Sequence, residues 1–501
     1  MNIIDRIKNI FRKGAVTIGV KQNLSSVLDH PKIAGDSKEY ARIKDSLARY
    51  EGVYPAIKYK NSNGKEVQRK PGTINMMKKV ANKYATVVFN EQCEINVGDG
   101  KEDALSEFIS GVFDHNDFKK NFSKYLEPMF AIGGLACRPY YDVAQNQIEF
   151  SWALPDAFYP LHSNTNNISE CALTFRTTKA VGDKNIYYTL IEFHEWQDGR
   201  YIITNELYRS EQSNIVGMLV PLSEVYEDLQ PETIIDGLTR PLFVYLKPSG
   251  FNNINPYSNL GLGVCDNCKD TLDRINRTFD QYDQEITKGK RRILVSEHLL
   301  NSQMDEQGNI KLFFDDTEDV FQKIPSGGLD DYTIEDLTSE IRSTQYIDTI
   351  NHHFKTLEME VGLSAGTFYF DGRSTKTATE IVAENTQTYQ SRSMQITEVE
   401  KFIKELVVSV CELGNALGVY KGVIPKFSDI GVDFRDGAFQ STDEKITYYQ
   451  KLISMGYPTS KALEEILELP EGKGEELLAE GLRESGTRMS GMIPDLPTEA
   501  E

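Results

Sequence analysis

Cysteine is scarce in this 501-residue sequence. Its six cysteines are too few for a disulfide scaffold, and no secretory signal pattern is present, so we expect a protein of the reducing cytoplasm. Long apolar runs are absent as well, because none approaches the ~20 residues that a membrane-spanning helix needs. The composition therefore excludes an integral membrane protein.

Basic residues are outnumbered by acidic ones. Lys and Arg total 55 against 75 Asp and Glu, which gives a formal net charge of −20. Tight binding of nucleic acid depends mainly on Lys and Arg that neutralise phosphates, so this charge argues against a firm grip on DNA or RNA. An acidic chain can still surround DNA without holding it. With 40% hydrophobic and 26% charged residues, the chain is typical of a globular protein with two or more structural units.

Motifs of nucleotide and metal chemistry are missing too. The sequence has no P-loop and no G-x-G-x-x-G, so nucleotide hydrolysis has no support. Cys265 and Cys268 form a C-x-x-C, but no second ligand pair accompanies them, which favours buried helix thiols over a zinc site or a redox pair. His352 and His353 are adjacent in a helical pattern and so face different ways. We expect no enzyme, no cofactor and no metal site.

One motif does suggest catalysis. Residues 362–366, Gly-Leu-Ser-Ala-Gly, match the G-x-S-x-G nucleophile elbow, in which a strained strand-to-helix turn exposes the serine. Here a helical pattern precedes the motif and β-prone residues follow it. A serine hydrolase that uses Ser364 is therefore the weaker interpretation, and Ser364 is expected to be a loop residue.

Long apolar-striped helices are the strongest positive feature. Steps of three or four residues keep one face apolar from Val264 to Ile286, and similar steps, with one wider gap, run from Ile334 to Val361 and end at Gly362. A third helix opens with the T-x-x-E box of Thr377 and Glu380 and continues for about 40 residues, or roughly 60 Å. No ordinary single-domain core is that wide, so we expect these helices to pack against neighbouring subunits in a closed ring.

Strand patterns surround the helices. Residues 186–196 and 201–208 flank Asp198-Gly199, a strong hairpin signal, and further strands are expected at 148–152, 172–177 and 241–246. A small β insertion at 288–331 carries strand-like runs at 293–295, 310–314 and 320–324. A strand at 430–434 and helices at 441–455 and 460–467 follow, whereas roughly the last thirty residues, with few apolar anchors, are expected to be flexible.

The first residues form a short amphipathic pattern. Ile3, Ile4, Ile7, Ile10 and Phe11 share a face surrounded by Lys and Arg. Such a face can lie on a membrane, but a helix that docks on its own protein or on a neighbour is the simpler interpretation.

Segments distributed over most of residues 40–440 resemble the portal proteins of tailed double-stranded-DNA phages, most closely the type in long-tailed phages of Gram-positive hosts. The segments that carry the resemblance are 50–55 (YEGVYP), 75–79, 87–91 (VVFNE), 155–160, 255–258 (NPYS), 289–295, 362–364 (GLS) and 377–380 (TATE). Another capsid or neck component of a phage is the alternative, but it would lack the helix, β insertion and helix order.

The resemblance implies an α+β portal fold with an α/β wing, a two-helix stem, a small β clip, a long kinked helix and a short helical crown. It divides the chain into wing (1–260), stem helix (261–288), clip (289–331), stem helix (332–362), tunnel loop (363–376), long wing-to-crown helix (377–418), wing strand return (419–440), crown helices (441–470) and a flexible acidic tail (471–501).

The resemblance also implies a structural role at the capsid vertex of the virion, after assembly in the host cytoplasm. The expected partners are other copies of the chain in a ring, usually of twelve, double-stranded DNA passing through without sequence specificity, the large terminase subunit, a head-tail adaptor, scaffold and major capsid protein, and no membrane. The tunnel loop facing DNA would contain Ser364, Gly366, Thr367, Phe368, Tyr369, Gly372, Arg373 and Lys376.

Two further residue groups complete these expectations. The stem would pack through Val264, Leu272, Ile275, Phe279, Ile341 and Phe354. A basic cluster, Lys288, Lys290, Arg291 and Arg292, lies where the first stem helix meets the clip. Cations at a helix C-terminus are favoured by the helix dipole, so a structural role is preferred there over phosphate binding.

Overall fold

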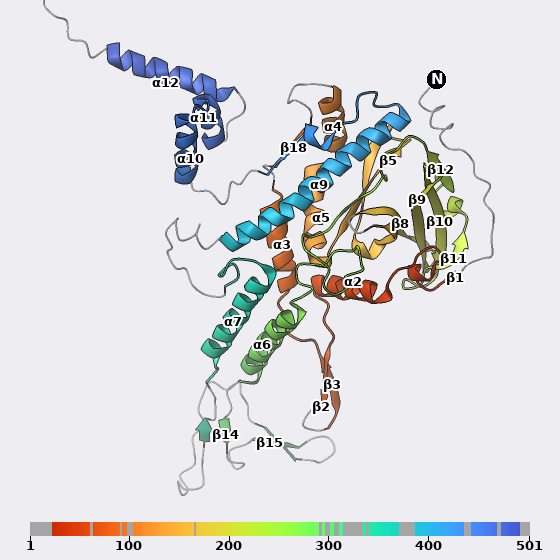
Figure 1. Ribbon diagram of the computed structural model, residues 1–501. Coiled ribbons are helices and arrows are strands. Elements are labelled where there is room, and N and C mark those ends of the chain that lie inside the picture. The colour runs from red at the N-terminus through yellow and green to blue at the C-terminus, as the bar shows by residue number, and fades with distance from the viewer. Residues whose placement is uncertain are drawn as a thin grey trace, which may run out of the picture.

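The computed structural model describes residues 23–60, 64–90, 93–97, 104–164, 167–289, 293–295, 301–304, 310–313, 334–336, 340–369, 386–434, 442–467 and 472–490. A mixed body of sheet and helix forms the main mass (Figure 1). A pair of helices and a β-hairpin project from one side of it, and the C-terminal helices lie at another side (Figure 1). The fold is α+β, as expected. Among the described helices, none has the length and apolar character to cross a membrane.

An antiparallel sheet forms one half of the body, in the strand order β1-β11-β10-β9-β8-β7 with β12 also pairing with β10. The expected hairpin at its centre is confirmed: Asp198 and Gly199, with φ of 50° and 75°, make the turn that the right-handed twist of the strands favours. The strands are β1 (Asn23–Leu24), β7 (Phe158–Ser163), β8 (Ile168–Val181), β9 (Lys184–Gln197), β10 (Arg200–Ser210), β11 (Gly217–Val220) and β12 (Glu232–Ile235).

Helices and a second sheet, β13-β5-β6, form the other half. In Figure 1 the long helix α9 crosses in front of α3 and α5. The elements are α2 (Ser37–Tyr50), α3 (Met76–Val88), α4 (Ala104–His115), α5 (Phe118–Ile132), α9 (Thr386–Leu417), β5 (Leu135–Asp142), β6 (Gln147–Ala153) and β13 (Val244–Leu246), and strand β4 (Glu94–Val97) pairs with β18 (Ile430–Asp433).

The expectation that the longest helix needs neighbouring subunits to bury its apolar face is wrong for α9. Its apolar residues, among them Phe402, Ile403, Leu406 and Val410, are buried in the core of the same chain, between the helices and the second sheet. The main core of this protein is therefore wide enough for much of a long helix, and the length of α9 is no evidence for neighbouring subunits. Residues 377–385, with the predicted capping box, lie outside the described residues.

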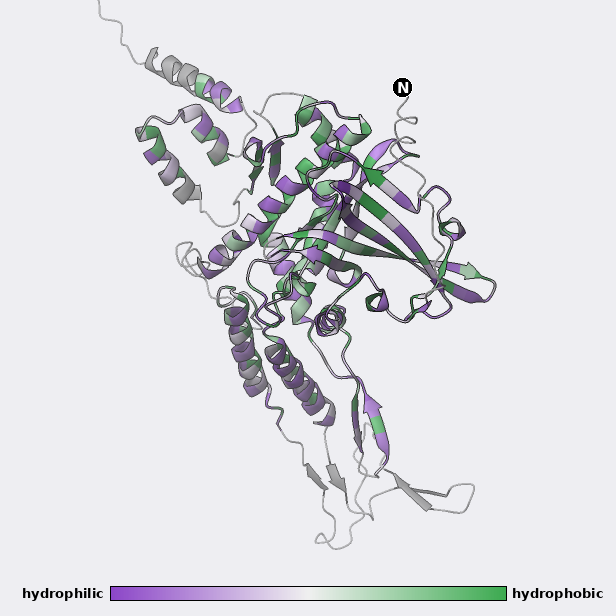
Figure 2. Ribbon diagram, turned by 45° about the vertical axis from the view of Figure 1, so that its right-hand side comes forward, coloured by the Kyte–Doolittle hydropathy of each residue, from purple (hydrophilic) through white to green (hydrophobic). Residues whose placement is uncertain are grey.

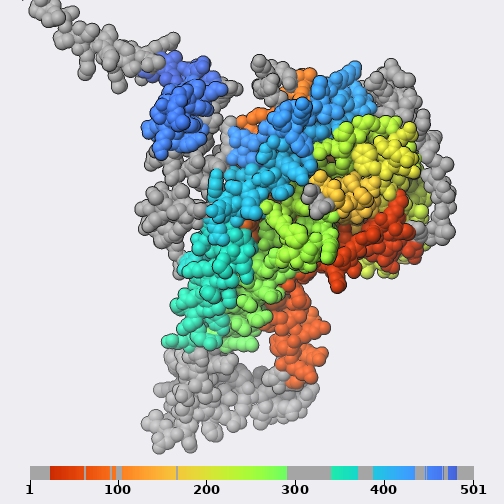
Figure 3. All heavy atoms as spheres, in the orientation of Figure 1, coloured from red at the N-terminus to blue at the C-terminus, as the bar shows by residue number. Residues whose placement is uncertain are grey.

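The projecting pair consists of α6 (Lys269–Lys288) and α7 (Ser343–Val361), with the hairpin β2 (Ile57–Lys60) and β3 (Glu66–Arg69) extending beside α6 (Figures 1 and 3). Beyond them, β14 (Ile293–Val295) pairs with β17 (Ile334–Asp336), and β15 (Asn301–Met304) pairs with β16 (Ile310–Phe313). The β insertion is thus confirmed for 293–295 and 310–313, whereas the predicted run 320–324 lies outside the described residues.

Two helix boundaries differ from the expected ones. The second projecting helix was expected from residue 332, but Ile334 lies in β17 and the helix begins at Ser343. The first begins at Lys269, because residues 264–267 form a turn in front of it. In both cases the apolar spacing continues past the helix start, since apolar residues also occur in a strand and in a buried turn.

The C-terminal segment consists of α10 (Thr442–Ser454), α11 (Thr459–Leu467) and α12 (Lys473–Ser490). The first two match the predicted helices. The third forms where the composition predicts a flexible tail; its run of Glu, Leu, Ala and Arg favours a helix despite the glycines.

Candidate functional site

The projecting helices pack on each other through a short apolar seam near the body. Leu272 and Ile275 of α6 and Ile350, Phe354 and Leu357 of α7 are buried. In the ribbon of Figure 2, most residues along the pair are hydrophilic, whereas hydrophobic residues are more frequent in the body. The seam therefore sets the angle of the pair, and most of its surface is free to meet solvent or another chain.

Polar contacts replace the apolar seam at the far end of the pair. The rings of Tyr282 and Tyr346 stack at 5.3 Å between centroids, and Arg342 donates to both carboxylate oxygens of Glu285, at 3.1 and 2.6 Å. These hydrogen bonds hold the pKa of Glu285 at about 2, well below its usual value. The ion pair closes the helix pair just before the β insertion.

Of the six predicted packing residues, Leu272, Ile275 and Phe354 are buried in the same core cluster. Phe279 packs at the edge of the core, partly buried. Val264 lies in the turn before α6, where its N–H donates to the carbonyl of Phe130 at 2.8 Å. Ile341 precedes α7 and is 41% exposed, so it does not belong to the seam.

A buried charge cluster fixes the pair to the body. The Arg42 guanidinium donates to Asp266 and, at 2.7 Å, to Glu39, while Ser46 donates to the other oxygen of Asp266 at 2.6 Å. The adjoining backbone is closely packed: a Cβ at Gly263 would lie 2.1 Å from the carbonyl oxygen of Ala131. The turn before α6 is therefore held rigidly on the core.

The loop after α7 is anchored by an acid that the sequence interpretation missed. Glu358 is fully buried, and its carboxylate accepts the backbone N–H groups of Gly366, at 2.8 Å, and of Phe368. Burial raises the pKa of Glu358, which the N–H donors counteract. The sequence signal for this anchor is a Glu among apolar residues just before a Gly-rich loop. Apolar spacing along a helix identifies only the apolar residues that pack inward, so it does not predict a buried acid.

Ser364 faces inward, not toward a substrate. It is 3% exposed, and its hydroxyl lies 2.9 Å from the Thr388 hydroxyl and accepts the Thr388 N–H at 3.1 Å. Helix α7 precedes it, and Gly362, with φ of 72°, caps that helix. The serine lacks the strand-turn-helix setting of a nucleophile elbow and instead ties the loop to α9.

The other predicted loop residues have mixed placements. Thr367 donates its hydroxyl to the Ser364 carbonyl, Phe368 packs partly against the core, and Tyr369 is 51% exposed. Only Tyr369 among these extends outward from the anchored base. Gly372, Arg373 and Lys376 lie outside the described residues.

The basic cluster and the C-x-x-C cysteines are the remaining residues that the sequence singled out. Lys288 is exposed at the end of α6, and Lys290, Arg291 and Arg292 lie outside the described residues. Cys265 and Cys268 are buried as expected, with the Cys268 thiol donating to the Cys265 carbonyl at 3.4 Å, although they lie in the turn before the helix and at its N-cap. The described residues contain no group of three or more His, Cys, Asp or Glu placed to hold a metal ion.

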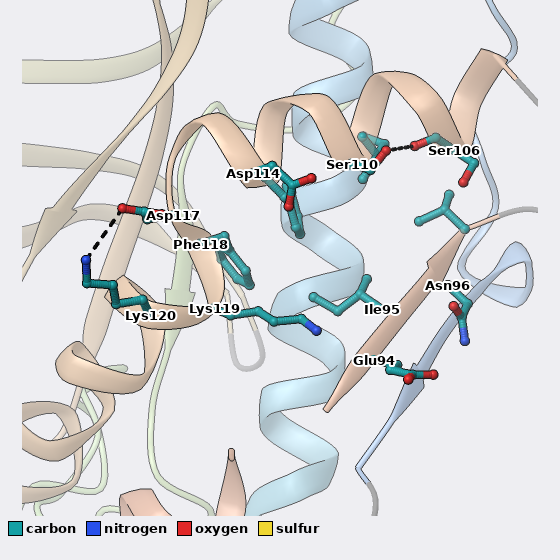
Figure 4. A pocket seen from close by; sticks show the side chains of 13 residues that line it. Glu94, Ile95, Asn96, Ser106, Ser110, Asp114, Asp117, Phe118, Lys119 and Lys120 are labelled. Atoms are coloured by element: carbon teal, nitrogen blue, oxygen red, sulfur yellow. Dashed lines mark hydrogen bonds and ion pairs between the residues drawn. The ribbon is translucent and has the colours of Figure 1, made fainter. Parts of the chain in front are cut away.

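A pocket of about 530 Å³ lies between β4, α4 and the start of α5 (Figure 4). Carboxylates and lysines share its lining with Ile95 and Phe118. Ser110 and Ser106 bond along their own helix at 2.7 Å and do not point at a common centre. The lining shows no arrangement typical of a catalytic site.

A family model described as "Phage portal protein, SPP1 Gp6-like" matches residues 29–479. The chain belongs to this family of phage portal proteins. This portal subunit is also similar to a solved structure titled "Neck of empty GTA particle computed with C6 symmetry", with 9% identity and a TM-score of 0.41 over 90% of this chain and 96% of that one. No curated protein matches the sequence.

Family membership gives the portal subunit a structural role in the phage head, at the capsid vertex. It also implies a homo-oligomeric ring with capsid or neck partners. The proposed function should therefore assign a role to three features: the anchored loop, the projecting helices and the β strands beyond them.

Proposed function

We propose that about twelve copies of this portal subunit close into a ring around a channel for double-stranded DNA. In this arrangement α6 and α7 form the stem, and the β insertion forms the clip, which docks the large terminase subunit and later the head-tail adaptor. The wing contacts scaffold and major capsid protein during assembly in the host cytoplasm. The observation that carries the proposal is the projecting, largely hydrophilic helix pair rigidly fixed to a body that already has a complete core of its own.

An exposed apolar loop on the body is evidence for a contact between neighbouring copies. Within residues 250–258, Phe251, Ile254 and Tyr257 are 73%, 49% and 96% exposed, an unusual density of apolar surface for a monomer. In Figure 3 this lime-green segment lies on the near face beside α9, and Ser249 donates to the Gln395 side chain there at 2.8 Å. A heterologous ring contact needs such a surface, because each copy docks on a different surface of the next.

The apolar loop is also preorganised. Asn252 is buried, and its side-chain amide donates to Glu39 and to the Leu260 carbonyl, each at 3.0 Å. Asn253 and Asn267 exchange two amide hydrogen bonds. A loop held in this way loses little entropy on docking, which favours binding to a neighbouring subunit.

The loop after α7 is proposed to face the DNA. Glu358 and Ser364 hold its base, and Tyr369 is half exposed, which supports the proposal that the part of the loop beginning at Tyr369 contacts the DNA. Deletion of residues 369–373 spares both anchors. We expect procapsids carrying this deletion to assemble but to package little DNA, measured as nuclease-protected DNA per particle.

A short deletion of residues 211–213, in the exposed turn between β10 and β11, is the control and should package normally. Loss of the ring in the 369–373 deletion, or normal packaging with it, would overturn the assignment of the DNA-facing loop.

A further inference from the structure

Two packed helices carry a concentration of exposed lysines, although the chain as a whole has a negative net charge. Helices α3 and α5 each contain the spacing Lys-Lys-x-x-x-Lys, at 78, 79 and 83 and at 119, 120 and 124, and all six side chains are exposed. Lys119 and Lys120 both line the pocket shown in Figure 4, where Lys119 extends toward Ile95 and Lys120 extends the other way, toward Asp117. The five lysines other than Lys119, namely Lys78, Lys79, Lys83, Lys120 and Lys124, are called the lysine face here.

The lysine face is built on a rigid base. The Phe89 and Phe122 rings lie 4.9 Å apart and the Tyr84 and Phe130 rings 5.4 Å apart, so the two helices run antiparallel with a shared buried seam. In α3 the lysines lie from the first turn to just past the middle of the helix, and in α5 Lys120 and Lys124 lie in its first half. In an antiparallel pair they are therefore spread along the whole length, about 20 Å for the 13 residues of α3.

Few carboxylates oppose these charges on the same two helices. A carboxylate oxygen of Asp117 lies 3.7 Å from the Lys120 Nζ, and one of Glu127 lies 4.0 Å from the Lys78 Nζ. Both distances are long for an ion pair. The Glu127 carboxylate already accepts from Tyr50 at 2.7 Å and from Asn82 at 2.6 Å. The lysine face thus keeps a net positive charge on a chain whose formal charge is −20.

The other exposed residues on these faces identify the kind of partner. They are Asn82, Thr86 and Ser123, and no large apolar side chain is exposed on α3 or α5. Subunit interfaces are depleted in Lys and depend on buried aromatic and apolar anchors, which the lysine face lacks. Lys, Asn, Ser and Thr are, by contrast, the side chains that contact DNA phosphates.

We propose that the lysine face binds the phosphate backbone of double-stranded DNA without reading its sequence. It is a second DNA contact, on the body of the subunit and separate from the loop after α7. The choice of DNA as the polyanion rests on the proposed function. A face about 20 Å long spans roughly six base pairs, since a duplex carries one charge per ~1.7 Å.

The test uses the full-length protein and a fluorescein-labelled duplex of random sequence, with anisotropy measured between ~50 and ~200 mM salt. The triple variant Lys79→Ala, Lys83→Ala and Lys124→Ala should bind more weakly, and the slope of log K against log salt should fall by up to about 2.7, or 0.9 per phosphate contact. Alanine is a strong helix former, so the helices should remain intact. Arginine at the same three positions should restore binding.

The control variant, Lys44→Ala, Lys184→Ala and Lys421→Ala, removes the same charge from exposed positions elsewhere. Equal loss in both variants, or no DNA binding by the wild-type protein, would overturn the proposal. So would loss of assembly in the first variant alone, measured by light scattering, because the lysine face would then be a subunit contact. If the wild-type protein forms no ring even with scaffold and major capsid protein added, the proposed function fails, but the comparison of the two variants still decides the role of the lysine face.

Discussion

At the residue scale, buried charges are concentrated where the projecting helices join the body. Arg42, Glu39 and Asp266 have side chains that are 7%, 3% and 0% exposed, and the Arg42 Nε has no hydrogen-bond partner among the described atoms. Charges removed from water in this way are tolerated only while each is paired. The cluster therefore fixes one orientation of the helices at a cost in desolvation.

Substitution Asp266→Ala would leave the Arg42 guanidinium buried with only Glu39 to balance it. We expect the free energy of unfolding to fall by about 3–5 kcal/mol, measured by urea denaturation. The control is Asp270→Ala, an exposed acid in the first turn of α6, which should change stability by less than about 0.5 kcal/mol. Equal effects of the two substitutions would show that the cluster has no special role.

The ion pair at the far end of the helices gives a pH dependence. The pKa of Glu285 is depressed to about 2 in the folded protein, so its contribution to stability is present above its ordinary value near 4.5 and is lost as the pH falls toward 2. We expect the stability difference between the wild type and Glu285→Gln to be constant near neutral pH and to shrink below about pH 4.5. A difference that grows on acidification would contradict the observed pairing with Arg342.

At the element scale, the loop 250–258 is proposed to be a docking element between copies. Replacement of Phe251 and Tyr257 by Ser should reduce ring assembly at least tenfold at a given protein concentration, measured by mass photometry, because exposed aromatic anchors contribute most to docking. The circular dichroism spectrum should not change, since both side chains are exposed. Val143→Ser with Val181→Ser, at exposed apolar positions in a turn and at the end of β8, is the control, and equal loss there would contradict a specific role of the loop.

The sequence predicts elements best where one local signal dominates. The β9–β10 hairpin was predictable because alternating residues flank an Asp-Gly turn. The start of α7 was not, because Ile334 fits a helical step as well as it fits a strand that pairs with β14. Glu358 and the lysine face are tertiary features: the first depends on a loop folding back onto its helix, and the second on two helices that come side by side from positions about forty residues apart.

At the scale of the whole molecule, charge is distributed unevenly. A strongly acidic subunit offers a passing duplex few lasting contacts, while the lysine face supplies a local one. A ring of such subunits would let DNA move through its channel and hold it weakly elsewhere. The rigid junction at Arg42 and Asp266 would keep the stem aligned with the body while this happens.

The native mass of the purified protein, measured by light scattering with negative-stain images of the same peak, tests the central claim most directly. The account predicts a ring of about a dozen subunits with a central hole. A compact dimer would contradict it, as would a monomer that remains monomeric after scaffold and major capsid protein are added.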